Sequence, residues 1–199
     1  MSDRFCVRSS AAACARRLKR DAAVRPEVLP HPMILYAQAF ALTVFAAVMA
    51  VAAFEDFRRL VIPNLLPIVL CAFWPVYFAA APSLYGALAA IGCAAAVFVV
   101  GAVLFARGYL GGGDVKLLSA ATLWAGPAGT PALLMLTAVI GGALALFLLM
   151  PFGGQIAAAA RGMLGQSPIR VERGLATRVP YGVAIAGAAL IVTLPPHLG

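Results

Sequence analysis

The chain has 199 residues, of which 63% are hydrophobic and 11% are charged, and its mean hydropathy is +0.97. This composition is far from that of soluble globular domains and is typical of proteins that cross a membrane several times. The formal net charge of +8 does not indicate a nucleic-acid partner, because no aromatic residues are interleaved with the basic ones in a soluble basic domain.

The first 32 residues are the most basic part of the chain. They hold seven of its fifteen basic residues, namely Arg4, Arg8, Arg16, Arg17, Lys19, Arg20 and Arg25. The segment lacks the apolar core of a secretory signal. We expect residues 1–32 to be disordered or absent from a native product that starts at Met33, and residues 33–199 to form a single membrane-embedded domain.

Apolar segments follow one another from residue 33 onward. They are Met33–Phe54, Val61–Ala81, Leu84–Ala106, Val115–Gly126, Ala132–Phe152 and Val179–Leu194. Most approach the roughly 20 residues that a helix needs to cross a bilayer, whereas the fourth is shorter. The sequence therefore predicts an all-α polytopic membrane protein, a bundle of about six transmembrane helices with a short fourth helix.

The basic residues after Met33 follow a pattern that predicts the orientation of the chain. They lie in the connections after the first, third and fifth apolar segments, namely Arg58, Arg59, Arg107, Lys116, Arg161, Arg170, Arg173 and Arg178. Because cytoplasmic loops are enriched in Lys and Arg, these connections are predicted to face the cytoplasm. The basic segment 1–32 would then lie on the outer side of the membrane, which conflicts with its high positive charge. A native product that starts at Met33 would remove this conflict.

Only four acidic residues follow Met33, and ionisable groups beside membrane spans usually face a cavity or a partner. Glu55 and Glu172 each lie close to an arginine and are interpreted as ordinary residues at helix ends. Asp56 ends the first apolar segment, whereas Asp114 immediately precedes the fourth. Because two crossings separate these aspartates, both are predicted at the cytoplasmic boundary, where contact between them is possible.

Three glycines directly precede Asp114 in the stretch GYLGGGDVKLLSA, residues 108–120. Glycine permits positive φ and close backbone approach, so Gly111, Gly112 and Gly113 predict that one helix ends and the next begins inside the protein. A helix that begins at Asp114 would place the carboxylate where unpaired N–H groups favour negative charge. A phosphate-binding P-loop is not indicated, because it requires GxxxxGK[ST].

The segment around Asp56 reads FEDFRRLVIPN, residues 54–64. Arg58 and Arg59 are typical cytoplasmic anchors, and Pro63 is compatible with the first turn of the second helix. Asn64 is open to two interpretations, because its amide could satisfy backbone groups or orient a substrate.

Three ordered motifs together resemble those of the type IV prepilin peptidases, intramembrane aspartic proteases of the GxGD class. The motifs are D-x-R-x-x-x-I-P-N at Asp56–Asn64, G-x-G-D-x-K-L at Gly111–Leu117 and P-Y-G at Pro180–Gly182. The resemblance implies a catalytic pair, Asp56 and Asp114, and cleavage of prepilin leader peptides at the cytoplasmic face of the bacterial inner membrane during pilus biogenesis.

The same resemblance implies supporting roles for the other motif residues and no cofactor or metal. These residues are Gly111, Gly113, Lys116, Arg58, Pro63, Asn64, Pro180, Tyr181 and Gly182. Tyr181 could equally belong to an interfacial aromatic belt.

The chain departs from the longer members of that family, which carry an N-methyltransferase region with paired CxxC motifs near the first spans. Only a few residues separate the first two apolar segments here, and no CxxC occurs. The short form resembles the peptidases of tight-adherence (Flp) pilus systems. A PAL sequence at Pro131–Leu133, a motif also known from the presenilin class, is interpreted as a loop and the start of a helix.

In the implied mechanism the two carboxylates share one proton, because neighbouring acids cannot both ionise cheaply. One activates water and the other protonates the leaving amine. The expected partners are the lipid bilayer and a prepilin with a basic leader followed by an apolar helix. The basic connection 153–179 could guide this substrate or be an ordinary solvated loop. A proton-coupled transporter or ion relay and a non-catalytic membrane scaffold remain alternatives.

Overall fold

The computed structural model describes residues 32–79, 83–150, 155–156, 159, 162–163 and 180–194. Contacts between residues divide the chain into two units, Met1–Pro32 and Met33–Gly199, and the fold described below is that of the second unit. The predictions for the basic segment 1–32 and for most of the connection 153–179 lie outside the described residues.

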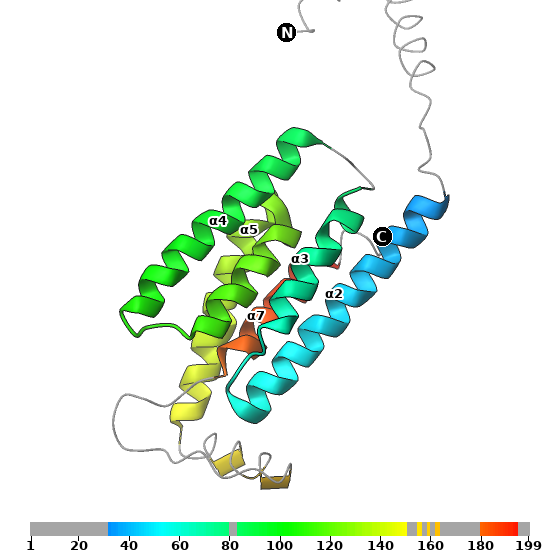
Figure 1. Ribbon diagram of the computed structural model, residues 1–199. Coiled ribbons are helices and arrows are strands. Elements are labelled where there is room, and N and C mark those ends of the chain that lie inside the picture. Colours follow the sequence, from blue (N-terminus) through cyan, green and yellow to red (C-terminus); the bar gives the residue numbers. More distant parts are fainter. Residues whose placement is uncertain are drawn as a thin grey trace, which may run out of the picture. The chain divides into compact units, whose positions relative to one another are not determined.

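The described part of this unit is built from five helices and has no strand (Figure 1). The helices are α2 (Pro32–Arg59), α3 (Leu65–Phe78), α4 (Leu84–Ala106), α5 (Gly112–Leu149) and α7 (Tyr181–Thr193). The prediction of an all-helical fold is confirmed.

The prediction of six membrane spans is not supported. Within the described residues, three helices are long and apolar enough to cross a membrane: Met33–Arg59, Leu84–Ala106 and Gly112–Leu149. The helices α3 and α7 are apolar but shorter, with 14 and 13 residues. Hydropathy overestimated the length of α3, because the predicted start, Val61, lies in a non-helical connection between α2 and α3.

Two residues account for that connection. Leu60 has a φ of 53°, in the left-handed region that ends a helix, and its N–H donates to the Asp56 carbonyl oxygen at 2.9 Å. Ile62 precedes Pro63, and the residue before a proline is driven out of the helical region. Pro63 therefore lies before α3 and not in its first turn, which corrects the prediction for this residue.

The helix α5 unites the predicted fourth and fifth segments, but it is not straight. At Gly126 the backbone has φ 64° and ψ −178°, a conformation that essentially only glycine adopts. Pro127 follows, as is common in the first turn of a helix. The break therefore separates two helical halves, and the predicted loop at Pro131–Leu133 is wrong because these residues lie inside the second half.

Contacts on both sides of Gly126 show that the chain reverses direction there (Figure 1). The first half of α5 runs alongside α3: Gly113 packs against Ile62 just before α3, and the Trp124 indole N–H donates to the Leu70 carbonyl oxygen at 3.0 Å. The second half runs antiparallel to α7, because Gly129 lies beside Val192 and Gly141 beside Tyr181.

The core is centred on aromatic contacts among α2, α3 and the first half of α5. The Trp124 ring lies 4.8 Å from the ring of Phe45 and 5.0 Å from that of Tyr77, measured between centroids. The α7 helix is buried along most of its length, and its alanines allow close packing against α5.

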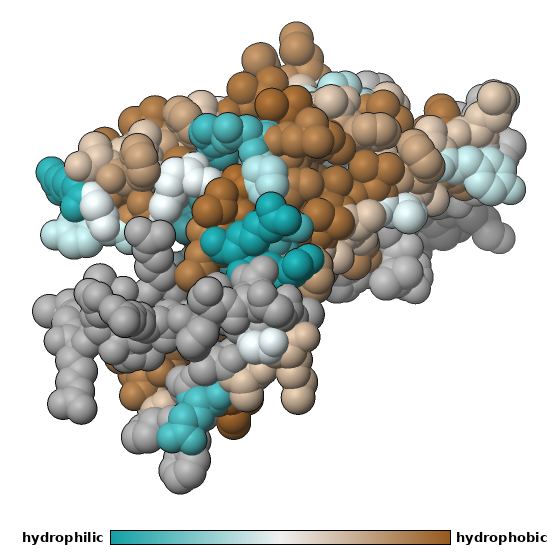
Figure 2. Space-filling model, turned by 60° about the horizontal axis from the view of Figure 1, so that its bottom comes forward, coloured by the Kyte–Doolittle hydropathy of each residue, from teal (hydrophilic) through white to brown (hydrophobic). Residues whose placement is uncertain are grey.

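The outer surface differs from the core. Figure 2 shows broad apolar areas interrupted by a group of hydrophilic residues, and many large apolar side chains are exposed. Such a surface suits contact with lipid.

We expect Gly126→Ala to lower the unfolding temperature of the purified protein in detergent. A Cβ at φ 64°, ψ −178° is strained, at a cost of about 1–3 kcal/mol. Gly142→Ala is the matched control, because Gly142 lies in the same helix and a Cβ there meets nothing within 4 Å. The control should be neutral or slightly stabilising. Equal melting temperatures for the two variants would contradict the reversal at Gly126.

Candidate active site

Asp56 is a buried carboxylate in the last turn of α2. Only 5% of its surface is exposed, and its Oδ2 atom accepts a hydrogen bond from the Gly182 backbone N–H at 2.6 Å. A buried carboxylate is costly unless it is paired and hydrogen-bonded. This contact joins the end of α2 to the start of α7, although 125 residues separate the two in the chain.

The start of α7 is built to receive that carboxylate. Pro180 is its buried N-cap, and Gly182 is the second helical residue, so its N–H is one of those that the helix itself leaves unpaired. The positive end of the helix dipole also favours a negative charge there. A Cβ at Gly182 would lie 2.8 Å from both Cβ and Oδ2 of Asp56, so only glycine fits without a shift.

Asp114 lies at a second helix N-terminus, in the first turn of α5. Gly111 is the N-cap, and a Cβ there would lie 2.7 Å from the Asp114 Oδ2 atom, so this carboxylate folds back over the first turn of α5. Asp56 is close enough for its charge to act on Asp114. The structure thus brings the two predicted carboxylates to the same end of the helices.

Of the two properties predicted for the glycines before Asp114, close backbone approach is used and positive φ is not. Positive φ occurs at Gly108 and not at Gly111, Gly112 or Gly113, and α5 begins at Gly112 and not at Asp114. Their contribution is close packing: a Cβ at Gly113 would lie 3.0 Å from the Cβ of Ile62. The connection after α2 can therefore approach the first turn of α5.

Lys116 and Asn64 form a hydrogen bond between the two segments that carry the aspartates. The Lys116 Nζ atom donates to the Asn64 Oδ1 atom at 2.8 Å, and both side chains are exposed. Asn64 is the N-cap of α3 and follows the connection that leaves Asp56, whereas Lys116 lies just after Asp114. The pair ties together the two segments that carry the carboxylates.

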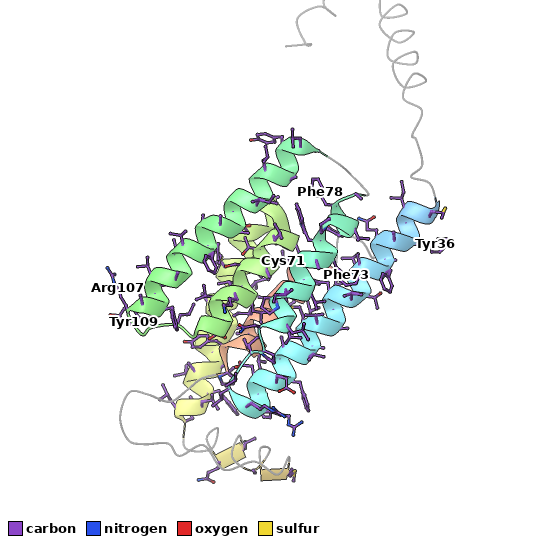
Figure 3. The ribbon with its side chains drawn as sticks, in the orientation of Figure 1. Tyr36, Cys71, Phe73, Phe78, Arg107 and Tyr109 are labelled. Carbon is purple, nitrogen blue, oxygen red and sulfur yellow. The ribbon has the colours of Figure 1, made fainter. Side chains whose placement is uncertain are left out.

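Of the remaining charged residues of α2, Arg59 is exposed, whereas Glu55 and Arg58 are partly buried. The Arg59 Nε atom is 3.2 Å from Glu55 Oε2, in a pair one helical turn apart, which agrees with the interpretation of Glu55 as an ordinary residue at a helix end. The Arg58 guanidinium carbon lies 5.2 Å from the centre of the Phe54 ring. Arg107 caps α4 near the start of α5 (Figure 3).

Two packing residues of the site were not among the predicted site residues, although Ile62 belongs to the first motif. Ile62, with 7% of its surface exposed, contacts Gly113, and Gly141 makes room for the ring of Tyr181, which would be 2.9 Å from a Cβ there. The glycine pair at 141–142 inside an apolar segment was the available signal for the second contact. Across the described ranges, no three His, Cys, Asp or Glu side chains gather as metal ligands.

We expect Gly182→Ala to destabilise the protein by about 1–3 kcal/mol, because the added methyl displaces the Asp56 carboxylate from its N–H donor. Thermal unfolding in detergent measures this effect. Gly187→Ala on the same helix is the control, since the nearest atom to its Cβ is 3.9 Å away. If both variants unfold at the same temperature, the hydrogen bond between the Gly182 N–H and Asp56 does not contribute to stability.

A comparison with protein-family models matches residues 43–146 to the type IV leader peptidase family. A search of curated proteins gave no match, and neither did a search of solved structures. The matched range covers just over half of the chain and includes both aspartates with the motifs around them. This match, together with helices suited to a membrane, shows that the chain belongs to the type IV leader peptidase family. Members of this family act as prepilin leader peptidases.

Proposed function

We propose that the chain is an aspartic endopeptidase that removes the leader peptide of a prepilin, with Asp56 and Asp114 as its catalytic pair. One observation carries the proposal: two carboxylates from distant segments lie at the N-termini of α5 and α7, near enough for the charge of Asp56 to act on Asp114. Paired carboxylates that share one proton are the machinery of aspartic proteases.

The proposed reaction needs water and these two side chains. The ionised carboxylate takes a proton from water as the water oxygen bonds to the scissile carbonyl carbon, and the protonated carboxyl donates a hydrogen bond to the developing oxyanion. Collapse of this intermediate breaks the C–N bond, and the leaving nitrogen receives a proton from the pair. Neither a metal nor a cofactor is part of the scheme.

The other motif residues have supporting roles in this proposal. Gly182 holds Asp56 through its N–H, and Pro180 and Tyr181 fix the start of α7. The Lys116 and Asn64 pair keeps the segments of the two aspartates together. The remaining motif residues act through packing or surface charge, and they are Gly111, Gly113, Arg58 and Pro63.

We infer that cleavage takes place at the cytoplasmic face of the bacterial inner membrane. The basic side chains of the described residues are Arg58, Arg59, Arg107 and Lys116, and they lie at or beside the helix ends that carry the two aspartates. Because cytoplasmic connections are rich in Lys and Arg, this end is assigned to the cytoplasm.

We further propose that residues 33–199 act as one catalytic domain of the short, tight-adherence (Flp) type. Only Leu60–Asn64 separate α2 from α3, which leaves no room there for the methyltransferase region of the longer family members. The product of cleavage should therefore carry an unmethylated new amino terminus, which mass spectrometry of the cleaved pilin measures. Methylation of that terminus by the purified chain would contradict this assignment.

We expect Asp56→Asn and Asp114→Asn each to lower cleavage of an Flp-type prepilin by at least about a hundredfold, because either change removes a group that moves the proton. Asparagine keeps the shape of the side chain and an oxygen that can accept the Gly182 N–H, so the fold should persist. Gel analysis of prepilin cleavage by purified protein in detergent measures the effect.

Glu55→Gln is the control for that experiment. Glu55 precedes Asp56 in α2 but pairs with Arg59, so its loss should leave cleavage nearly unchanged. Turnover close to that of the wild type in either aspartate variant would refute the catalytic pair. Solute flux into liposomes driven by a pH gradient, with no cleavage, would favour a transporter instead.

A further inference from the structure

A groove of about 580 Å³ lies between α3, α4 and the first half of α5. Its size falls within the range of binding sites for small ligands or a few side chains. The lining residues are Asn64, Pro67, Ile68, Cys71, Ile91, Ala94, Ala95, Phe98, Lys116, Ser119, Ala120 and Leu123. The groove is separate from the two aspartates, but Lys116 at its edge lies only two residues after Asp114.

The lining residues repeat one spacing on each of the three helices. The positions are 64, 67, 68 and 71 along α3, 91, 94, 95 and 98 on α4, and 116, 119, 120 and 123 on α5. Each set follows i, i+3, i+4 and i+7, which is a single face of a helix. The groove is therefore an elongated slot about two helical turns, or roughly 10 Å, in length.

The floor of this slot has small side chains and its rims have large apolar ones, an arrangement that allows another helix to pack into it. Ser119 and Ala120 are buried at its floor, and Ala94 and Ala95 on α4 add only small side chains. At the rims, Ile68 and Phe98 have 62% and 46% of their surface exposed. Small residues let a second helix approach closely inside a membrane, and exposed apolar rims add contacts along its sides.

One end of the slot is polar, and it is the end nearest the candidate site. Lys116 and Asn64 lie there, joined by their hydrogen bond, and both are exposed. The α4 helix runs in the opposite sense to the first half of α5, because Gly101 near its end packs against Val115. Cys71 and Leu123 therefore lie toward the far, apolar end.

We propose that this groove is the docking site for the apolar helix of the prepilin substrate. The inference rests on the proposed function and adds the route by which the substrate reaches the aspartates: sideways from the lipid, along α3 and α4. The peptide would lie in the slot as an amphipathic or apolar helix lies in a partner's groove. Its end near Lys116 would then enter the candidate site.

The polar end favours a peptide over a lipid chain as the occupant. A helix must unwind locally before its peptide bond can be cut, and the freed backbone groups need hydrogen-bond partners because hydrocarbon supplies none. The Lys116 ammonium has three donors, of which the structure uses one on Asn64, and the Asn64 amide can both donate and accept.

The chain contains two cysteines that suit a test by disulfide cross-linking. Cys71 is exposed and lines the groove, whereas Cys93 is partly exposed on α4 and lies outside the groove lining. Two variants are compared, Cys93→Ser and Cys71→Ser, each with Asp114→Asn to keep the substrate intact. Both also carry Cys6→Ser and Cys14→Ser. The probe is an Flp-type prepilin with a single cysteine moved along its apolar segment, under mild copper-catalysed oxidation.

The proposal predicts cross-links to Cys71 at prepilin positions that recur every three or four residues, with yields at least tenfold above those to Cys93. Equal yields at the two cysteines, or none at Cys71, would overturn it. A disulfide could also join the Cys71 residues of two copies of the protein. If added prepilin did not lower the yield of that cross-link, the groove would be assigned to self-association and the proposal would be overturned.

A bulky substitution gives a second measurement that does not depend on oxidation. Ala95→Leu narrows the slot, and Ala96→Leu alters an exposed neighbour outside it. We expect Ala95→Leu to raise the KM for full-length prepilin about tenfold with little change in kcat, and Ala96→Leu to change neither. Normal cleavage by Ala95→Leu, while Asp56→Asn is inactive, would reject the groove and leave the proposed peptidase standing. Absence of cleavage by the wild type would instead reject the peptidase.

Discussion

The hydrogen bond from the Gly182 N–H to the Asp56 carboxylate is the contact on which the arrangement of the site depends. Asp56 is almost completely buried, so its charge must be met by a donor, and the unpaired N–H groups at the start of α7 supply one. This requirement fixes α7 against the end of α2 and explains why the position facing the carboxylate is a glycine. Asp114 repeats the same solution at the start of α5, so both acids are placed by helix N-termini and not by flexible loops.

The reversal at Gly126 makes that placement possible. A straight helix from Gly112 to Leu149 would be about 57 Å long, far more than a bilayer core requires. Because the chain turns back, the first half of α5 carries Asp114 alongside α3, and the second half packs along α7, whose first residues hold Asp56. One glycine in a conformation closed to other residues therefore lets a single element contact both sides of the site.

A protease of a membrane-embedded substrate needs charged groups that stay wet and an apolar surface that receives the peptide. The described residues separate these tasks along the helices. The aspartates and the basic side chains lie at one end, and the slot between α3, α4 and α5 extends away from them among apolar side chains. The Lys116 and Asn64 pair stands where the two regions meet, and in the proposed docking a helical substrate would unwind there.

Composition and hydropathy by themselves determined the helical, membrane-embedded class, and the limits Leu84–Ala106 of α4 match the predicted segment. The scarcity of acids singled out Asp56 and Asp114, and the motifs around them pointed to the family that the comparison shows. Tertiary structure alone decided that a single break at Gly126 joins the predicted fourth and fifth segments, that the glycines before Asp114 act without positive φ, and that Gly182 donates to Asp56. Hydropathy averages over neighbours in the chain and reports only that a segment prefers lipid. The backbone conformation at a helix break and the partner of a buried charge depend on contacts between residues far apart in sequence, which no local pattern contains.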